Sequence, residues 1–129
     1  MSRNILDQIG HTALMPLRRV VPANGARILL KLESENPTGS MKGIGAGFVV
    51  PLWREGIADR IERVSTEDAT EMALRLAREE GLFAGTSTGA NVVAALRTAE
   101  RLGPGATIVS IMCDTGMKYL KTFGPRVIK

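Results

Sequence analysis

The chain has 129 residues, of which 44% are hydrophobic and 23% are charged, and its formal net charge is +4 at pH 7. This length and apolar content suit a single domain over residues 1–129. The scattered charges and the aromatic content of 4% argue against a nucleic-acid-binding surface. The single cysteine, Cys113, excludes an internal disulfide and favours a reducing cytoplasm, and no signal segment or membrane span is expected from the sequence.

The N-terminal third predicts an antiparallel hairpin. Residues 4–9 are typical of a short helical turn. Residues 14–20 predict a strand, which Pro16 restricts to the edge of a sheet because proline lacks the N–H that a central strand donates. A turn over residues 21–25 then leads into a second strand over residues 27–32 with an apolar centre, and two strands around such a turn favour a hairpin.

The next stretch contains little regular structure by its composition. Residues 33–47 hold four glycines and a proline, which predicts a loop. Residues 51–55 predict one helical turn that Gly56 would end, and residues 61–64 predict a short strand.

Ser65 begins the clearest helix. Its hydroxyl is placed to cap the amide of Asp68, Glu71 and Arg75 have the spacing of an ion pair on the exposed side, and Gly81 is a natural C-terminal cap. One apolar face recurs at helical spacing and comprises Ala69, Met72, Ala73, Leu76 and Ala77.

The last third predicts a brief strand at residues 82–84, a second helix and a final strand. The helix begins near Ser87 or Thr88 and ends at Gly103. Its buried face comprises Val92, Ala95, Leu96, Ala99 and Leu102. Residues 107–113 are a nearly continuous apolar run typical of a central parallel strand. The order of elements predicts an α/β fold, with a mainly parallel sheet flanked by helices, right-handed crossovers and the N-terminal antiparallel hairpin.

Lys42 is the first residue that could carry chemistry. It follows the turn-forming residues 36–40, and a lysine held by such a turn can present its amine to a carbonyl ligand and form a Schiff base. The alternative is a solvated lysine after an ordinary turn. Gly43, Gly45 and Gly47 would let the backbone approach a flat ring closely, although they follow no strand and so do not fit a dinucleotide-binding fingerprint.

Two further groups lie near predicted element ends. Gly85, Thr86, Ser87 and Thr88 open the second helix, where free amides and hydroxyls suit a phosphate or carboxylate, and a plain Ser/Thr cap is the alternative. Asp114 and Thr115 follow the last strand, where α/β proteins place ligands, with a simple Asx turn as the alternative. One cysteine and one histidine leave no zinc site.

Several ordered segments resemble the cysteine synthase/cystathionine β-synthase family of pyridoxal-phosphate enzymes, which have the tryptophan-synthase-β fold type. Residues 31–42 (KLESENPTGSMK) resemble its cofactor-lysine segment, residues 9–14 (IGHTAL) its IGNTPL, and residues 43–49 (GIGAGFV) its GIGAGFVP. Residues 85–91 (GTSTGAN) are similar to its GxSSGA, and Cys113-Asp114-Thr115-Gly116 with Tyr119 is similar to its late DSGxxY.

The resemblance implies a remnant of the large domain of that family and pyridoxal 5'-phosphate as cofactor. It gives Lys42 the Schiff base and the catalytic proton transfer, and Ser87 the hydrogen bond to the pyridine nitrogen. It also assigns a cofactor-binding set of Gly43, Gly45, Gly85, Thr86, Thr88, Asp114 and Thr115.

The chain departs from the family between Lys42 and Gly43. Residues 1–42 resemble the family N-terminus and residues 43–129 its C-terminal half, so the central part is missing. The GTGGT-like phosphate loop and the loop that grips the substrate carboxylate are absent with it. The sheet edges and apolar surface that the missing part normally covers would then be exposed.

The implied activity is β-replacement or β-elimination on O-acetylserine-like or serine-like amino acids, as in cysteine biosynthesis, impaired by the deletion. One alternative is a non-catalytic truncated member acting through association, and another is a phosphate-ligand binding module. The expected partners are a small amino-acid substrate and either a second copy in a dimer or a full-length relative, with no nucleic acid and no membrane.

Overall fold

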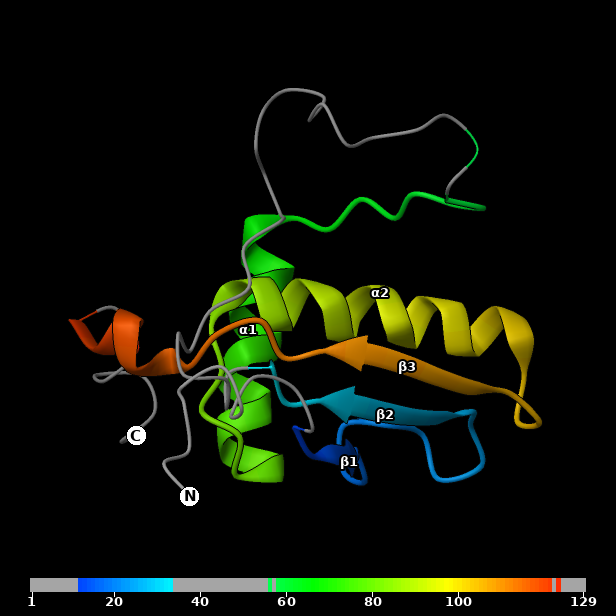
Figure 1. Ribbon diagram of the computed structural model, residues 1–129, viewed down its shortest axis with the longest axis horizontal. Helices are drawn as coiled ribbons and strands as arrows, with labels where there is room; N and C mark the ends of the chain where they lie inside the picture. Colours follow the sequence, from blue (N-terminus) through cyan, green and yellow to red (C-terminus); the bar gives the residue numbers. More distant parts are fainter. Residues whose placement is uncertain (1–11, 34–55, 57, 122, 124–129) are drawn as a thin grey trace, which may run out of the picture.

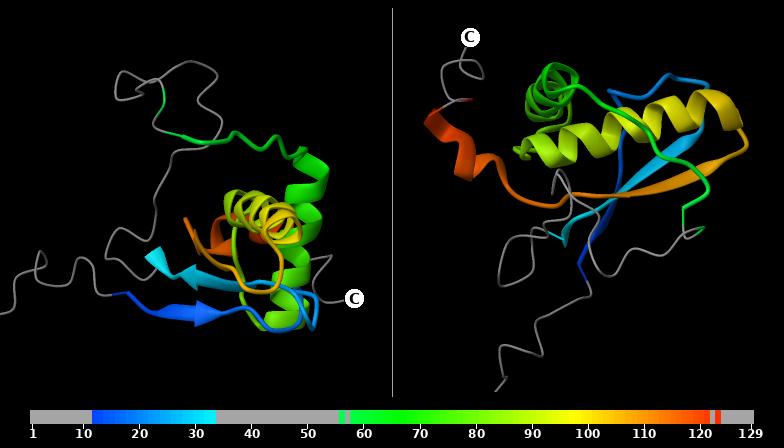
Figure 2. Two further views of the ribbon diagram at one scale, coloured as in Figure 1. Left: turned by 90° about the vertical axis from the view of Figure 1, so that its right-hand side faces the viewer. Right: turned by 90° about the horizontal axis from the view of Figure 1, so that it is seen from above.

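A computed structural model describes residues 12–33, 56, 58–121 and 123. Three strands form one sheet in the order β1 (Leu14–Pro16), β2 (Arg27–Lys31) and β3 (Thr107–Ile111). β1 is antiparallel to β2, and β2 is parallel to β3. Two helices, α1 (Thr66–Arg75) and α2 (Thr86–Leu102), lie on one side of this sheet (Figures 1 and 2). The α/β fold with its N-terminal antiparallel hairpin is therefore confirmed.

The hairpin contains the predicted edge strand in shortened form. Pro16 pairs with Leu29, and the turn is closed by the Gly25 amide, which donates to the carbonyl of Pro22 at 3.0 Å. β1 ends at Pro16 rather than at residue 20. The reason is a long-range contact, because one carboxylate oxygen of Glu80 accepts hydrogen bonds from the three consecutive amides of residues 18–20.

α1 begins as predicted and ends differently. Ser65 Oγ accepts from the Asp68 amide at 3.0 Å. The helix continues into η3 (Leu76–Glu80), a π-helical turn, and Gly81 ends it in the left-handed conformation with φ of 72°. The predicted pair of Glu71 with Arg75 is present only as a charge attraction, since Arg75 donates its hydrogen bonds to both carboxylate oxygens of Glu79, at 2.7 and 3.1 Å. Two bonds in a fork geometry favour Glu79 as the partner.

α1 crosses α2 at very short range. A Cβ atom on Gly89 would lie 1.9 Å from the carbonyl oxygen of Ala69 and 2.9 Å from the amide nitrogen of Ala73. Only a residue without a side chain allows the two backbones to approach in this way. Figure 2 shows α2 nearly end-on, with α1 running across it.

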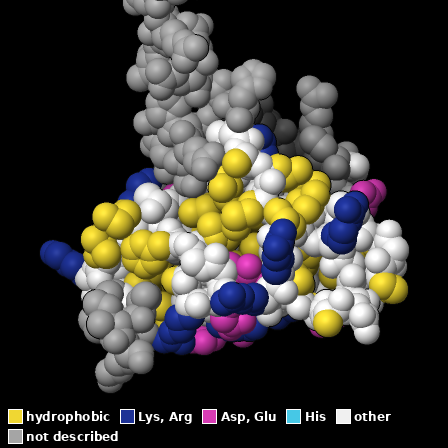
Figure 3. Space-filling model, turned by 90° about the horizontal axis from the view of Figure 1, so that it is seen from below, with side chains coloured by type: hydrophobic (Ala, Val, Ile, Leu, Met, Phe, Trp, Pro, Cys, Tyr) yellow, Lys and Arg dark blue, Asp and Glu magenta, His cyan; other side chains and the backbone are white. Residues whose placement is uncertain are grey.

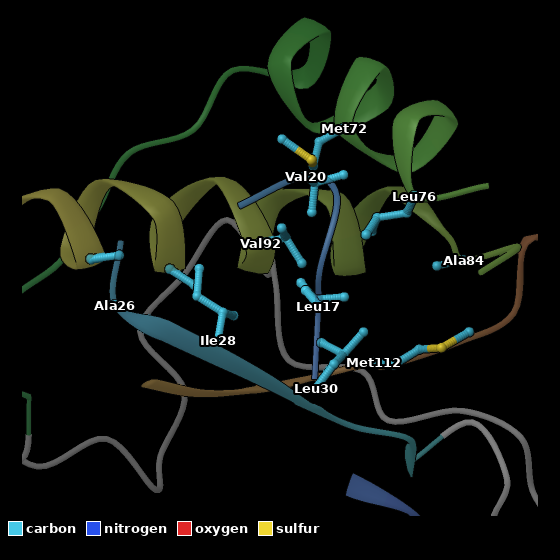
Figure 4. Packing of buried hydrophobic residues seen from close by; sticks show 12 residues of the cluster. Leu17, Val20, Ala26, Ile28, Leu30, Met72, Leu76, Ala84, Val92 and Met112 are labelled. Atoms are coloured by element: carbon cyan, nitrogen blue, oxygen red, sulfur yellow. The ribbon is translucent and has the colours of Figure 1, made fainter. Parts of the chain in front are cut away.

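The core lies between α1, α2 and the upper face of the sheet (Figure 4). Ile28 and Leu30 of β2 point into it, and Met72 and Leu76 reach it from α1 and η3. The apolar face predicted for α2 is buried at Val92, Ala95 and Ala99, while Leu102 remains 62% exposed near the end of the helix. The other members of the cluster are Leu17, Val20, Ala26, Ala84 and Met112.

β3 is not the central strand that its apolar sequence predicts. It pairs with β2 alone among the described strands, and β2 is central. An apolar run is typical of a strand covered on both faces, but Val109 is 60% exposed and Ile111 is 37% exposed. Figure 3 shows apolar side chains gathered on this face of the sheet, opposite α2.

The strand predicted at residues 61–64 is also wrong. This segment pairs with no described strand and is held by side chains of α2 instead. Glu62 accepts from Arg101 at 2.5 Å, and the carbonyl of Arg63 accepts from Arg97 at 2.7 Å. Ile61 is 72% exposed. Bonds to side chains of α2 therefore take the place of strand pairing in this segment.

Candidate functional site

The start of α2 is held by a short antiparallel contact. The segment before the helix, residues 83–85, runs beside residues 114–116. The amide of Gly85 donates to the carbonyl of Asp114 at 3.2 Å, and the amide of Gly116 donates to the carbonyl of Phe83 at 2.8 Å. This contact brings two groups together that the sequence singled out separately, Gly85–Thr86–Ser87–Thr88 and Asp114–Thr115.

α2 begins without a side-chain cap. Its N-cap residue is Gly85, so the expected alternative of a plain Ser/Thr cap is wrong. The amides of Thr88 and Gly89 bond to the Gly85 carbonyl, at 3.1 and 3.2 Å. The first turn therefore presents the amides of Thr86 and Ser87 at the positive end of the helix dipole.

A hollow of about 230 Å³ lies beside this helix start. Thr86, Ser87 and Ala90 line it from α2, and the beginning of α1 lines it from the other side with Val64, Ser65, Thr66 and Ala69. Both helices thus start at the same hollow. No charged side chain is among these lining residues, and no hydrogen bond joins the half-buried Ser87 hydroxyl to another described residue.

Sequence reasoning missed the contribution of α1 to this hollow. Ser65 and Thr66 were seen only as the start of a helix. Their position opposite Ser87 depends on the close crossing at Gly89, which no local pattern contains. The small residue in the first turn of α2 was the one available signal, because a glycine inside a helix often marks a close approach.

Thr88 lies on the inner side of α2 and fastens the helix to the end of β3. It is fully buried, and its Oγ1 accepts from the amide of Cys113 at 3.2 Å. One turn later, Asn91 Nδ2 donates to the carbonyl of Ile111 at 3.0 Å and to Cys113 Sγ at 3.3 Å. These bonds fix the helix start relative to Asp114.

Cys113 is a core residue, as expected. Its side chain is 8% exposed. Burial raises the pKa of the thiol, the hydrogen bond from Asn91 works against this rise, and the nearby carboxylate of Asp114 adds to it. A thiol with a raised pKa is a poor nucleophile near neutral pH.

Asp114 is the most unusual group in the region. Its side chain is 3% exposed, and Oδ1 has no hydrogen-bond partner. The hydroxyl of Tyr119 donates to Oδ2 at 3.4 Å. Thr115 serves a local role, since its Oγ1 accepts from the amide of Met117 and caps the short 3-10 helix η4 (Gly116–Tyr119).

Lys42, Gly43 and Gly45 lie outside the described residues, and so do the predicted turns at residues 4–9 and 51–55. Within the described ranges there is no group of three or more His, Cys, Asp or Glu side chains arranged for a metal ion. None of the helices in these ranges combines the length and the apolar character needed to cross a bilayer.

Comparison with known proteins relates this chain to pyridoxal-phosphate dependent enzymes of the cysteine synthase type. A sequence profile of the family described as "Pyridoxal-phosphate dependent enzyme" matches residues 48–114, about half of the chain. The cysteine synthase of Staphylococcus aureus (strain N315) is 42% identical over 82 residues, which are 64% of this chain and 26% of that protein. The probable cysteine synthase of Bacillus subtilis (strain 168) is 44% identical over 80 residues, covering 62% and 26%.

Solved structures give the same result. The cysteine synthase from Entamoeba histolytica superposes with a TM-score of 0.58 at 36% identity, over 64% of this chain and 25% of that one. The O-acetylserine dependent cystathionine beta-synthase from Helicobacter pylori gives a TM-score of 0.58 at 32% identity, over 74% and 33%. The chain spans about a quarter of the length of the curated relatives that it matches.

Proposed function

Because the chain belongs to the family of pyridoxal-phosphate dependent enzymes, we propose that it keeps the ring-nitrogen end of a cofactor site of the cysteine synthase type. The observation that carries this proposal is Ser87, whose hydroxyl lies at an uncapped helix start beside a hollow. The chemistry would be β-replacement or β-elimination on an O-acetylserine-like or serine-like amino acid. Its rate would be low, because the loops expected to hold phosphate and substrate carboxylate are missing.

The described residues fit the aromatic end of pyridoxal phosphate better than its phosphate. A serine hydroxyl can donate to a pyridine nitrogen or accept from it. The hollow has uncharged walls, and its alanine side chains, Ala69 and Ala90, suit the edge of a ring. No lysine or arginine lines it to balance a phosphate dianion. Ser87 and the helix amides beside it would therefore hold the ring nitrogen.

The bound cofactor supplies an electron sink for charge that develops at the α-carbon of an amino acid. The protein has to supply orientation and proton transfer. Thr88 and Asn91 hold α2 against the end of β3 and so fix the position of Ser87 in the first turn of the helix. Lys42, carried over from the family motif, would bind the cofactor covalently and move the α-proton at its Nζ.

The test is a spectrum of the purified chain mixed with pyridoxal phosphate, followed by borohydride reduction and peptide mapping. We expect a visible band and a label on Lys42. Lys42→Ala should abolish the label, whereas Lys118→Ala, which removes an exposed lysine, should leave it intact. Ser87→Ala should shift the band and weaken binding, and Ser110→Ala in β3 is the matched control. A label spread over surface lysines would refute the cofactor site.

Activity is a separate measurement. Cysteine formation from O-acetylserine and sulfide should be detectable with the loaded chain and absent from Lys42→Ala. If the label maps to Lys42 and no cysteine forms, the cofactor site survives and the substrate part of the proposal fails. A cytoplasmic location remains part of the proposal, since the reaction and the single buried Cys113 suit a reducing compartment.

The outer edge of β3 favours a second candidate, in which the chain acts by association with another copy of itself. β3 has an unpaired edge among the described strands, and Val109 and Ile111 expose apolar surface next to it. Two copies of an edge strand can pair antiparallel around a two-fold axis, which covers both edges at once. Association would then cover the open edge of β3, which lies next to the apolar face shown in Figure 3.

Sedimentation equilibrium tests this candidate. We expect a concentration-dependent dimer, at least about tenfold weakened by Val109→Lys, because two lysines would meet near the axis. Leu102→Lys is the control, since Leu102 is equally exposed but lies at the end of α2. A chain that stays monomeric alone and sediments with a full-length cysteine synthase would exclude the second copy as partner.

A further inference from the structure

The sheet has two faces, and the described helices cover only one of them. α1 and α2 pack on the face to which Ile28 and Leu30 point. Side chains alternate between the two faces along a strand, so Leu29 of β2 points to the opposite face. Residues paired directly across strands share a face, and Leu29 is paired with Pro16 of β1 and Val109 of β3. We call this side the outer face of the sheet.

The outer face is apolar and open. In the next row of paired residues, Leu14 of β1 and Ile111 of β3 lie on either side of Lys31. Leu14 is 49% exposed, Ile111 is 37% exposed and Val109 is 60% exposed. Figure 3 shows the apolar side chains that gather on this face. A contiguous apolar patch marks a surface that another element or molecule covers, because a sheet face is normally buried against a second layer.

The charged residues of the outer face are both cations, Arg27 and Lys31, at the two ends of β2. Arg27 donates to the Thr107 hydroxyl at 3.0 Å, and Lys31 donates to the carbonyl of Thr12, so both acceptors are uncharged. The ion pairs among the described residues include neither cation. Glu33 follows the strand, where the Thr12 hydroxyl donates to it at 2.7 Å. The outer face therefore combines an apolar surface with positive charge along its central strand.

From this arrangement we propose that the outer face binds an amphipathic helix of a partner protein, whose apolar stripe is bordered by acidic residues. The stripe would lie against Leu29 and Val109, and the acidic residues would meet Arg27 and Lys31. A helix is the element that already covers the other face of this sheet, and recognition of an apolar helix stripe by an open apolar surface is a common mode of peptide binding. Opposite charges at the border fix the orientation of the helix.

Charge argues against a second copy of the chain as the occupant. The apolar faces of α1 and α2 are buried in the core, so these helices are not available for a neighbouring molecule. Two outer faces related by a two-fold axis would bring Arg27 and Lys31 of one copy towards the same residues of the other. Such like charges repel, and the chain as a whole also has a net charge of +4. Pairing at the edge of β3, the second candidate above, would leave the outer face open.

The geometry of β2 sets the spacing of the acidic residues. Arg27 and Lys31 are four positions apart in a strand, which separates their Cα atoms by about 13 Å. In a helix lying along β2, two turns return to the same side after seven positions and about 10.5 Å. The long, flexible side chains of Arg27 and Lys31 span the difference. The partner helix should therefore carry acidic residues two turns apart at the border of its apolar stripe.

The first test uses the unmodified chain and two synthetic helical peptides of about 20 residues, long enough to be helical in water. The peptides share a leucine stripe and differ only at two border positions, seven residues apart, which are both glutamate in one peptide and both lysine in the other. Anisotropy of a fluorescent label on the peptide measures binding at low salt. We expect the glutamate peptide to bind at least about tenfold more tightly. Equal affinities, or no binding of the glutamate peptide, would overturn the proposal.

Variants of the chain locate the binding surface. Arg27→Glu should weaken the glutamate peptide about fivefold or more, whereas Lys118→Glu makes the same change in net charge on η4 and should have little effect. Leu14→Ser should weaken binding about fivefold by removing apolar contact on β1, away from the edge of β3. Leu120→Ser is its matched control, because Leu120 is 48% exposed and lies outside the sheet. Controls that weaken binding as much as the outer-face variants would place the peptide elsewhere and refute the proposal.

Two other occupants are outcomes of the same experiments. Binding to vesicles that contain phosphatidylserine, lost in Arg27→Glu and without a preference between the two peptides, would assign the outer face to a membrane surface and overturn the partner helix. Self-association that Leu14→Ser weakens in sedimentation equilibrium would assign it to a second copy, with the same consequence. Lys42→Ala should leave peptide binding unchanged, so a failure of the proposed cofactor site and a failure of this proposal are distinguishable.

Discussion

The crossing of α1 and α2 gives the sharpest prediction, because the close approach of the two helices requires that Gly89 has a hydrogen atom where other residues have a Cβ. A methyl group there would lie 1.9 Å from the Ala69 carbonyl oxygen, whereas real Cβ atoms keep at least 3.0 Å from such atoms. Both obstructing groups, the Ala69 oxygen and the Ala73 nitrogen, belong to the backbone and cannot rotate away. The helices must therefore separate by about 1 Å in the Gly89→Ala variant.

Two effects of opposite sign set the magnitude. Alanine in place of glycine inside a helix gains up to about 1 kcal/mol of intrinsic helix stability. Overpacking of a close-packed interior costs about 1–3 kcal/mol, and more where backbone obstructs. The overlap involves rigid backbone on both sides, so the cost exceeds the gain. We expect the free energy of unfolding to fall by about 2 kcal/mol.

Urea unfolding followed by circular dichroism measures this change. Gly105→Ala is the matched control, since a Cβ at Gly105 meets no atom within 4 Å and its stability should change little. The hollow between the two helix starts should also widen, which would weaken any ligand bound at Ser87. A Gly89→Ala chain as stable as the Gly105→Ala chain would refute the reasoning about the helix crossing.

Three further predictions concern buried or bonded polar groups. Burial of Glu80 acts to raise the pKa of its carboxyl, but the three backbone amides that it accepts outweigh burial and lower the pKa below its usual value. Its stabilisation should therefore be complete above about pH 4.3 and lost as pH falls through the folded pKa. Glu80→Gln should cost about 1 kcal/mol in urea unfolding at pH 7 and less as the pH is lowered, and a cost that does not change with pH would contradict this. Thr88→Val should destabilise by about 1–3 kcal/mol, because the buried amide of Cys113 loses its acceptor, and a neutral effect on the urea midpoint would show that the bond is dispensable. The Cys113 thiol, with its raised pKa, should react with a disulfide reagent at pH 8 at least about tenfold more slowly in the folded chain than in urea, and equal rates would mean that the site opens freely.

Local patterns predicted those parts of the fold that depend on neighbours in the chain. The Ser65 cap and the Gly81 termination follow from the chemistry of single helix ends, and both are confirmed. The length of β1 could not be predicted in this way. It depends on Glu80, which lies 60 to 62 positions away and accepts from the amides that would otherwise continue the strand.

The apolar run of β3 shows a different limit. Its sequence is that of a strand covered on both faces, and in this chain only one face is covered by described elements. The apolar sequence of a strand shows how buried the strand is expected to be. It does not show whether the elements that would cover the strand are present in this chain. A relative four times as long would supply further strands and helices, which agrees with the coverage of 26%.

In the candidate site, too, the local features could be predicted from the sequence and the tertiary contacts could not. Gly85, Thr86 and Ser87 were predicted to open a helix, and they do, because helix starts are local. Composition could not predict which residue lies beside that helix start, since Asp114 reaches Gly85 through the pairing of residues 83–85 with 114–116. A helix start with a buried carboxyl group beside it and a helix start without one can have the same local sequence. They differ only in what the rest of the chain folds against them, so the surroundings of this helix start are a tertiary property.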